Sequence, residues 1–238
     1  MPSLLYVCVR PETGAADAEH ASFRRALGAD VVDRLDLLQT SLDTEQLSRY
    51  KGVVVGGSPF NVSDTVKSAQ QQRVEADLEK LAAVAMDAQI AAFFTCFSIG
   101  VLTRMLGGQV GTATPEPASA TVITATPAGL EDPVFGPSGA ALTVFTAHKE
   151  SAEHTPPGAV LLATNEACPV QAYRVGTHMY AAQFHPEPTP RDFADRMTFY
   201  RHTGYFDPEE FDAVQRQVLS ASVTEGAALL RRFAQTFG

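Results

Sequence analysis

The first hundred residues alternate between short apolar runs and longer amphipathic stretches. Four short segments are predicted strands: residues 4–9, 52–55 and 90–94, which are apolar, and residues 31–38. Helical spacing predicts four helices around them: residues 15–27, 44–50, 66–87 and 99–106. Strands that are apolar throughout are buried on both faces, which is typical of a parallel sheet covered by helices on each side. The alternation therefore predicts an α/β fold with a largely parallel central sheet.

Beyond residue 109 the apolar runs become more closely spaced, with turn residues between them. Five of them are predicted strands: residues 121–126, 142–146, 160–163, 170–175 and 179–184. Because short strands joined by turns pair in antiparallel fashion, we expect these to be antiparallel additions to the same sheet. Helical spacing returns after Pro190 and predicts three further helices: residues 191–202, 208–220 and 224–237.

Together these patterns predict an α/β fold of the flavodoxin-like, three-layer type. It has a central mostly parallel sheet, antiparallel additions and extra C-terminal helices. Because the sequence has no internal repeat and no clear linker, residues 1–238 are predicted to form a single domain. Residues 1–190 would form its core and residues 191–238 a C-terminal helical extension.

Composition narrows the classes of function. The net charge of −9 disfavours binding to nucleic acid or to an anionic membrane surface. No run approaches the roughly 18 apolar residues that a membrane span needs, and the start of the chain has no secretory signal pattern. The three cysteines are too few and too widely spaced for a disulfide framework, so we expect a cytoplasmic protein. Histidine and cysteine spacings match no metal motif, and no metal or other cofactor is expected.

Cys96 lies at the junction of a predicted strand and a predicted helix. A side chain there stands at the carboxyl edge of the sheet, where open α/β folds bind ligands. The N-terminus of the following helix favours a thiolate. The turn Gly56–Gly57 ends the neighbouring apolar strand and can aim a backbone N–H at an oxyanion. Cys96 is therefore the candidate nucleophile, whereas Cys8 and Cys168 are expected to be structural.

A base and a group to orient it stand at the end of the last predicted strand. His185 and Glu187 lie on either side of Pro186 and project to the same side of an extended backbone. Taken alone, this pair has the pattern of a polar strand end. Together with Cys96 and the glycine turn, it predicts a thiol acyl-transfer site with a general base and an orienting carboxylate.

Four segments, in order along the chain, resemble the class I glutamine amidotransferases, the type with a Cys–His–Glu triad. VVVGGSPFNVSD (53–64) is similar to the family's strand and oxyanion loop, and FFTCFSIGVLTRMLGG (93–108) to its nucleophile elbow and following helix. LLATNEACPVQAY (161–173) resembles the approach strands, and AAQFHPE (181–187) the strand with the His and the Glu. The likeness is to the stand-alone branch that resembles the amidotransferase part of GMP synthase.

The resemblance implies a role for each matched residue. Cys96 would attack the side-chain amide of glutamine, His185 would act as general base and then acid, and Glu187 would hold the imidazole. The backbone N–H groups of Gly57 and Phe97 would form the oxyanion hole. The substrate would be bound by four residues, of which the last belongs to TAHKES (146–151): Gly56, Ser58, Gly100 and His148.

Three positions around the nucleophile differ from the family pattern. Phe94 and Ser98 stand where the family has glycines that permit a strained turn, and the bulky Phe94 needs additional space. Gly100 replaces a glutamine that helps to hold the substrate, which would widen the pocket.

These differences leave three hypotheses open. The first is a glutamine hydrolase that passes ammonia to a separate partner synthetase, because the sequence has no phosphate-binding GxxxxGK[ST] loop. The second is hydrolysis of γ-glutamyl amides or peptides through the same thioester. The third is a catalytically silent binding protein that kept the fold. The first two make glutamine or a γ-glutamyl compound the ligand.

Overall fold

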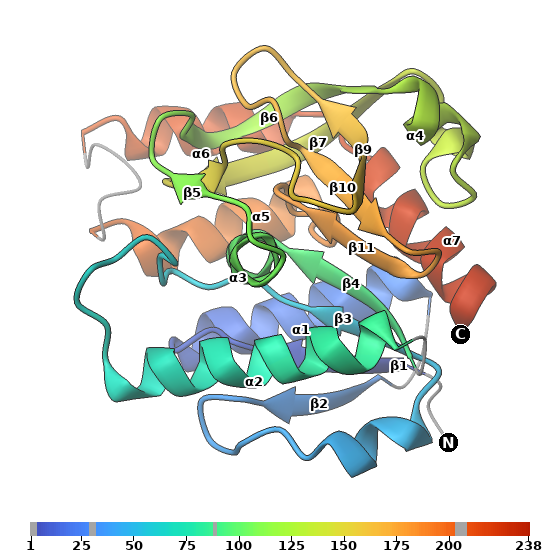
Figure 1. Cartoon of the computed structure of the whole chain (residues 1–238). Coiled ribbons are helices and arrows are strands. Elements are labelled where there is room, and N and C mark those ends of the chain that lie inside the picture. Colours follow the sequence, from blue (N-terminus) through green and yellow to red (C-terminus); the bar gives the residue numbers. More distant parts are fainter. Residues whose placement is uncertain (1–3, 29–31, 88–89, 203–208) are drawn as a thin grey trace.

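The computed structural model describes residues 4–28, 32–87, 90–202 and 209–238 (Figure 1). Within this part of the chain, nine strands form one mixed sheet. In spatial order they are β2 (Asp33–Asp36), β1 (Leu4–Cys8), β3 (Gly52–Val55), β4 (Ala91–Thr95), β11 (Met179–Ala182), β10 (Ala172–Val175), β9 (Ala159–Thr164), β6 (Glu116–Ala125) and β7 (Ala141–His148). The α/β class and the mixed sheet predicted from the sequence are confirmed.

Strand direction divides the sheet into two halves. β2, β1, β3 and β4 are parallel, and β11 is parallel to β4, with Ala182 paired to Thr95. β10, β9, β6 and β7 follow in antiparallel order. The last predicted strand therefore joins the two halves, since β11 is antiparallel to β10 but parallel to β4. This pairing brings the residues that follow β4 and β11 to the same edge of the sheet.

Helices cover both faces of the sheet. α2 (Ala69–Met86) and α3 (Phe97–Met105) pack on one face, and α1 (Thr13–Leu27) and α7 (Glu225–Phe237) pack on the other (Figure 1). Apolar residues alternate between the two cores along each central strand. On β4, for example, Phe94 belongs to the core beneath α2, whereas Phe93 meets Phe233 of α7 edge to face. Wholly apolar strands predict such a two-sided core.

The C-terminal helices contribute to the packing of the sheet. α5 (Pro190–Met197) and α6 (Phe211–Ser220) pack together against β6 and β7 through a third apolar cluster. α7 inserts Leu229, Leu230 and Phe233 into the core, where all three are fully buried. Residue 208, where the predicted second C-terminal helix begins, lies outside the described residues.

Some elements differ in extent from the expectation. The stretch 44–50 forms a 3₁₀ helix (Thr44–Arg49), and the long predicted helix begins at Ala69. Its start is set by Ser68, whose hydroxyl accepts from the backbone N–H of Gln71. Val31, at the start of a predicted strand, lies outside the described residues.

Other elements have no counterpart in the prediction. α4 (Pro127–Glu131) and a 3₁₀ turn (Gly136–Ser138) connect β6 to β7, and β5 (Val110–Gly111) pairs with β8 (Ser151–Ala152) in a separate ribbon. These pieces are too short to carry a hydrophobic period. By contrast, the 3₁₀ turn Thr198–Tyr200 lies within the predicted helix 191–202, of which α5 forms the first part. None of the described helices has the length and apolarity needed to cross a bilayer.

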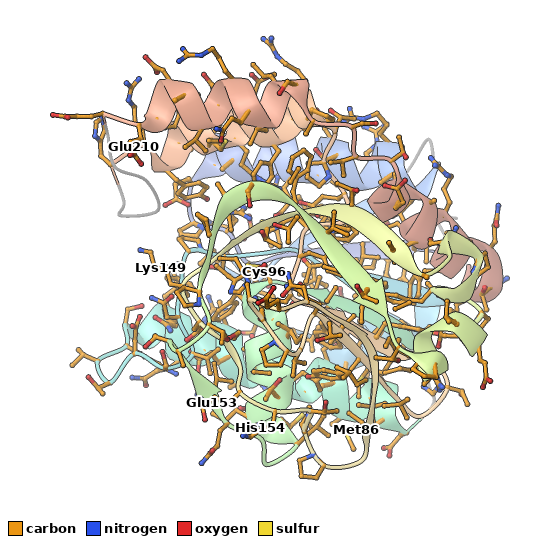
Figure 2. All side chains as sticks on the ribbon, turned by 90° about the horizontal axis from the view of Figure 1, so that it is seen from above. Met86, Cys96, Lys149, Glu153, His154 and Glu210 are labelled. Carbon is orange, nitrogen blue, oxygen red and sulfur yellow. The ribbon has the colours of Figure 1, made fainter. Side chains whose placement is uncertain are left out.

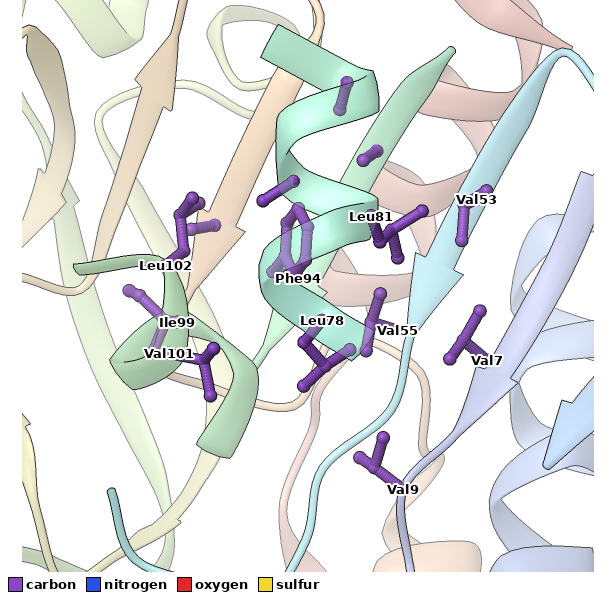
Figure 3. Packing of buried hydrophobic residues seen from close by; sticks show 14 of the residues in the cluster. Val7, Val9, Val53, Val55, Leu78, Leu81, Phe94, Ile99, Val101 and Leu102 are labelled. Atoms are coloured by element: carbon purple, nitrogen blue, oxygen red, sulfur yellow. The ribbon is translucent and has the colours of Figure 1, made fainter. Parts of the chain in front are cut away.

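Phe94 fills core space and does not crowd the turn that follows it. Its ring lies between the sheet and α2, beside Val55, Leu78 and Leu81 (Figure 3), and is 1% exposed. The residue paired with it on β11 is Ala181, which is small. The additional space that this phenylalanine requires is therefore found within the core.

Candidate active site

The candidate nucleophile stands in a strained turn near the centre of the molecule (Figure 2). Cys96 follows β4 and precedes α3 with φ 51° and ψ −113°, and is the one non-glycine residue with positive φ in the described part of the chain. Such a conformation costs about 1–3 kcal/mol. It is held by the Cys96 N–H, which donates to the Ala182 carbonyl at 2.8 Å, and by the Ser98 hydroxyl, which donates to the Thr95 carbonyl at 2.8 Å. Ser98 thus fits the turn.

The chain after β11 brings His185 to the same edge of the sheet. The His185 N–H donates to the Phe145 carbonyl of β7 at 2.8 Å, and its ring lies 6.0 Å from the Phe193 ring of α5. His185 Nδ1 lies 3.3 Å from Glu187 Oε1, at ion-pair distance but without the geometry of a hydrogen bond, and both side chains are buried. This arrangement leaves Nε2 as the ring nitrogen available to Cys96.

For His185 and Glu187, the effect of neighbouring charges on the pKa values outweighs the effect of burial. Burial disfavours the imidazolium, but Glu187 and the Cys96 sulfur together raise the pKa of His185 to about 9. Burial also disfavours the Glu187 carboxylate, but Arg196 and then His185 lower the pKa of Glu187 to about 2. At neutral pH the two groups form an imidazolium–carboxylate pair, which is able to give a proton to a leaving group.

A buried network of alternating charges lies behind the pair. Arg196 of α5 donates from Nη1 to Glu187 Oε1 at 2.6 Å and to Glu19 Oε1 at 3.2 Å. Glu19 of α1 also accepts from Arg10 Nη2 and from the Tyr6 hydroxyl, both at 2.7 Å. All five side chains are at most 6% exposed. Arg196 lies closer to Glu187 than His185 does, so Arg196 sets the position of the carboxylate.

The predicted oxyanion loop follows β3 beside Cys96. The Gly57 N–H donates to Glu19 Oε1 at 3.2 Å, so the structure shows this donor engaged with a carboxylate. A Cβ on Gly57 would lie 2.8 Å from the Cε1 of His185, which explains the glycine. Phe97 is the first residue of α3, where backbone N–H groups have no acceptor within the helix. Of the two predicted oxyanion donors, Phe97 is thus the one placed to act without a rearrangement.

A first pocket, here named the Glu150 pocket, opens beside Cys96. Its cavity has a volume of about 10 Å³, and three of the predicted substrate-binding residues line it: Ser58, Gly100 and His148. The fourth, Gly56, is not among its lining residues; a Cβ there would meet the Glu19 carboxylate.

The wall of the Glu150 pocket is tied together by one carboxylate. Glu150 accepts from the backbone N–H of Val62 at 2.5 Å and of Ser63 at 2.8 Å, which joins the loop after β3 to the segment after β7. Gln183 also lines this pocket, and its Oε1 has no hydrogen-bond partner among the residues described.

Gly100 does not leave the open space that the sequence predicts. A Cβ at this position would lie 3.1 Å from the Cγ2 of Val62 and 3.5 Å from Oε1 of Glu150. These two side chains occupy the room beside the glycine. The expectation of a wider pocket at Gly100 is therefore wrong.

His148 lines the Glu150 pocket, but both of its ring nitrogens are engaged within the protein. Nε2 lies 2.8 Å from Glu116 Oε2, and Nδ1 lies 3.0 Å from the Glu150 carbonyl. The Glu116 carboxylate also accepts from Asn165 at 2.8 Å and from Gln171 at 2.5 Å. This network holds the segment around His148 in place.

Among the residues that the structure describes, two buried clusters carry donor types that bind metal ions: Glu116–His148–Cys168 and Glu19–His185–Glu187. In the first, Glu116 accepts from a histidine and two amides, and in the second, Glu19 and Glu187 are paired with buried arginines. The carboxylates of the first cluster are therefore satisfied by hydrogen bonds, and those of the second by ion pairs.

A second pocket, here named the Arg196 pocket, opens from Cys96 in another direction. Its cavity has a volume of about 40 Å³. Phe193 and Met197 of α5 form apolar walls, and Arg10 and Arg196 lie at its polar end. Cys96 lines both pockets, whereas the imidazole of the predicted base lines the Arg196 pocket only.

The structure brings Cys96, His185 and Glu187 together at one sheet edge, as the sequence suggests. The buried charges Arg10, Glu19 and Arg196 were not identified from the sequence. Two of them could have been identified from the helix patterns, because Glu19 lies on the buried face of α1 and Arg196 on the buried face of α5. A charged residue on a buried helix face requires a partner, and often marks a site.

Comparison with known proteins agrees with this geometry. The family model of the class I glutamine amidotransferases matches residues 20–202. Gamma-glutamyl peptidase 3 of Arabidopsis thaliana is 28% identical over 153 residues, which is 61% of this chain and 57% of that protein. The glutamine-hydrolyzing GMP synthase of Ectopseudomonas mendocina is 28% identical over 145 residues, which is 58% of this chain and 26% of the synthase.

Solved structures show the same fold. A glutamine amidotransferase from Thermotoga maritima superposes with a TM-score of 0.71 at 18% identity, over 98% of both chains. The matched stretch spans little more than half of the peptidase and about a quarter of the synthase. The family model, by contrast, covers most of the described chain. The chain belongs to the class I glutamine amidotransferase family.

Proposed function

We propose that this protein hydrolyses the side-chain amide of glutamine through a thioester on Cys96. One observation carries the proposal: a cysteine in a strained strand-to-helix turn shares its sheet edge with the buried pair His185–Glu187. Strained backbone is retained where the surroundings enforce it, and it clusters at active sites. The nucleophile, the base and the group that orients the base are the parts that thiol acyl transfer requires.

In the acylation step the Cys96 sulfur attacks the amide carbon, and negative charge moves to the carbonyl oxygen. The Phe97 N–H at the start of α3 stabilises this oxyanion, and the Gly57 N–H joins it after leaving Glu19. His185 then gives its proton to the departing nitrogen. The C–N bond breaks, ammonia leaves, and a glutamyl thioester remains on Cys96.

In the second step water resolves the thioester. His185, now neutral, takes a proton from the water as the oxygen attacks the same carbon. The C–S bond breaks, glutamate is released, and the proton returns the site to its starting state. Glu187 orients the imidazole in both steps, and Arg196 holds Glu187.

The ammonia is proposed to pass to a synthetase that activates its acceptor. The stretch of GMP synthase that this chain matches is 26% of that enzyme. The part that activates the ammonia acceptor has no counterpart in the matched stretch. We assign that part to a separate partner protein.

A second candidate function is hydrolysis of γ-glutamyl amides by the same thioester. The Arg196 pocket supports it, because a cavity of about 40 Å³ beside Cys96 and His185 is larger than ammonia needs. The match to a gamma-glutamyl peptidase points in the same direction.

The proposal is tested by measuring glutamate and ammonia release from glutamine by the purified protein. Cys96→Ala should abolish release, whereas Cys168→Ala, which removes another buried cysteine, should retain it. A glutamine-mimicking electrophile should label Cys96, and His185→Ala should slow the labelling. Absence of both hydrolysis and labelling would identify a silent binding protein instead.

A further inference from the structure

We infer that Glu19 is a positioning residue that couples the oxyanion loop after β3 to Glu187. This inference rests on the proposed thioester chemistry and adds a residue to it. Glu19 lies on α1 and its side chain is fully buried. It lines neither the Glu150 pocket nor the Arg196 pocket, so it acts through other residues and not on the substrate.

One carboxylate oxygen of Glu19 serves both parts of the site. Oε1 accepts from the Gly57 N–H and from Arg196 Nη1, each at 3.2 Å. The same Arg196 nitrogen donates to Glu187 Oε1 at 2.6 Å. Gly57 carries a predicted oxyanion donor and Glu187 orients His185. A change at Glu19 therefore affects both the oxyanion donor and the triad carboxylate.

Two further contacts hold the Glu19 carboxylate in place. The Tyr6 hydroxyl donates to Oε2 and Arg10 Nη2 donates to Oε1, both at 2.7 Å. These donors remain when the Gly57 N–H turns from Glu19 to an oxyanion, so the charge of Glu19 stays paired throughout the reaction. Release of the Gly57 N–H costs a single hydrogen bond, and the oxyanion replaces Glu19 as its acceptor.

The two glycines of the oxyanion loop pack directly against these groups. A Cβ on Gly56 would clash with Glu19 Oε2, and a Cβ on Gly57 would lie 2.8 Å from the Cε1 of His185 and 3.4 Å from the Cβ of Cys96. Neither glycine has a positive φ, so close packing and not backbone conformation requires them. The loop is therefore in contact with Glu19 on one side and with the catalytic residues on the other.

The test measures kcat and KM for glutamine in Glu19→Gln, with kcat expressed per site that the glutamine-mimicking electrophile labels at completion. A residue that only stabilises the fold changes the number of labelled sites but not kcat per site. We expect kcat per site to fall about tenfold or more, because an oxyanion donor and the triad carboxylate are both displaced, and KM to stay within about twofold.

Glu75→Gln is the matched control for this variant. Glu75 is 4% exposed, is paired with Lys67 and Arg104, and lines neither pocket. The substitution thus removes a buried, doubly paired carboxylate elsewhere in the molecule. It should keep kcat per site, even where it lowers the number of labelled sites.

Gly56→Ala tests the coupling from the side of the loop and keeps every charge. Its methyl group pushes against the Glu19 carboxylate, so kcat per site should fall in the same way. In the double variant the two losses should be less than multiplicative, because both act on one contact. Should Glu19→Gln fail to fold, Gly56→Ala decides alone.

The outcomes separate the inference from the proposed function. Unchanged kcat per site in either variant, with glutamine hydrolysed by the unmodified protein, would overturn the inference and leave the proposed function intact. Multiplicative losses in the double variant would also overturn it, since Glu19 and the loop would then act separately. If the unmodified protein neither hydrolyses glutamine nor is labelled at Cys96, the proposed function and the inference both fail.

Discussion

At the scale of single residues, the site depends on how a buried carboxylate and a buried arginine share one histidine. Glu187 lies 2.6 Å from Arg196 and 3.3 Å from His185, so the arginine holds the carboxylate that in turn stabilises the imidazolium. The raised pKa of His185 follows from this arrangement. Proton transfer and ion pairing are thus coupled in the same few side chains.

This coupling predicts the pH dependence of hydrolysis. Because the pKa of His185 is raised to about 9, its acid form is present below that pH and is lost above it. We expect kcat/KM to fall as the pH rises through about 9. Glu187→Gln removes the charge that most strongly stabilises the His185 imidazolium, so the fall in kcat/KM should occur at lower pH. If kcat/KM of Glu187→Gln falls at the same pH as that of the unmodified protein, another group controls the fall.

A second residue-scale prediction concerns Glu19, which accepts from Tyr6, Arg10, Arg196 and the Gly57 N–H. Glu19→Gln keeps the shape of the side chain but removes its negative charge. The buried Arg10 and Arg196 then each lose one carboxylate partner. Breaking a buried ion pair from one side costs about 3–5 kcal/mol, and urea denaturation should show a loss of that size. The matched control Glu79→Gln, at a half-exposed pair with Arg104, should change stability by less than about 1 kcal/mol. Equal effects of the two variants would contradict the account.

At the scale of elements, the core residue on β4 and the strand-to-helix turn at Cys96 have separate roles. Phe94 precedes the turn by two residues, yet its ring lies beneath α2 (Figure 3). Phe94→Leu should therefore destabilise the fold by about 1–2 kcal/mol and leave kcat/KM for glutamine unchanged. Thermal denaturation and steady-state kinetics on the same sample would measure both. A large fall in kcat in a folded variant would show that Phe94 shapes the turn.

Which elements could be predicted from the sequence follows from their physical signals. Strands β1, β3 and β4 are apolar on both faces, and this pattern locates them and the elbow after β4. The pairing of β11 with β4, and hence the meeting of His185 with Cys96, is a long-range contact that leaves no local pattern. The sequence suggests this meeting only through polar residues at the ends of predicted strands, and the ordered family motifs support it. The room around Gly100 was misjudged, because the filling residue, Val62, belongs to a loop with no periodicity.

At the scale of the whole molecule, the C-terminal helices support the sheet that carries the site. Phe233 of α7 is fully buried against Phe93 and Tyr180. Phe233→Ala should cost about 3–5 kcal/mol, whereas Leu219→Ala, at a side chain 43% exposed, should cost far less. Chemical denaturation of both variants measures the difference. Similar values would indicate that α7 is an appendage and not part of the core.

The central claim is that Cys96 forms a glutamyl thioester with a γ-glutamyl amide. Rapid acid quenching during turnover, followed by proteolysis and mass spectrometry, tests it most directly. The account predicts one glutamyl group on the peptide that contains Cys96, none on the peptides with Cys8 or Cys168, and none in Cys96→Ala. Turnover of glutamine without any glutamyl group on Cys96, or with the group elsewhere, would contradict it.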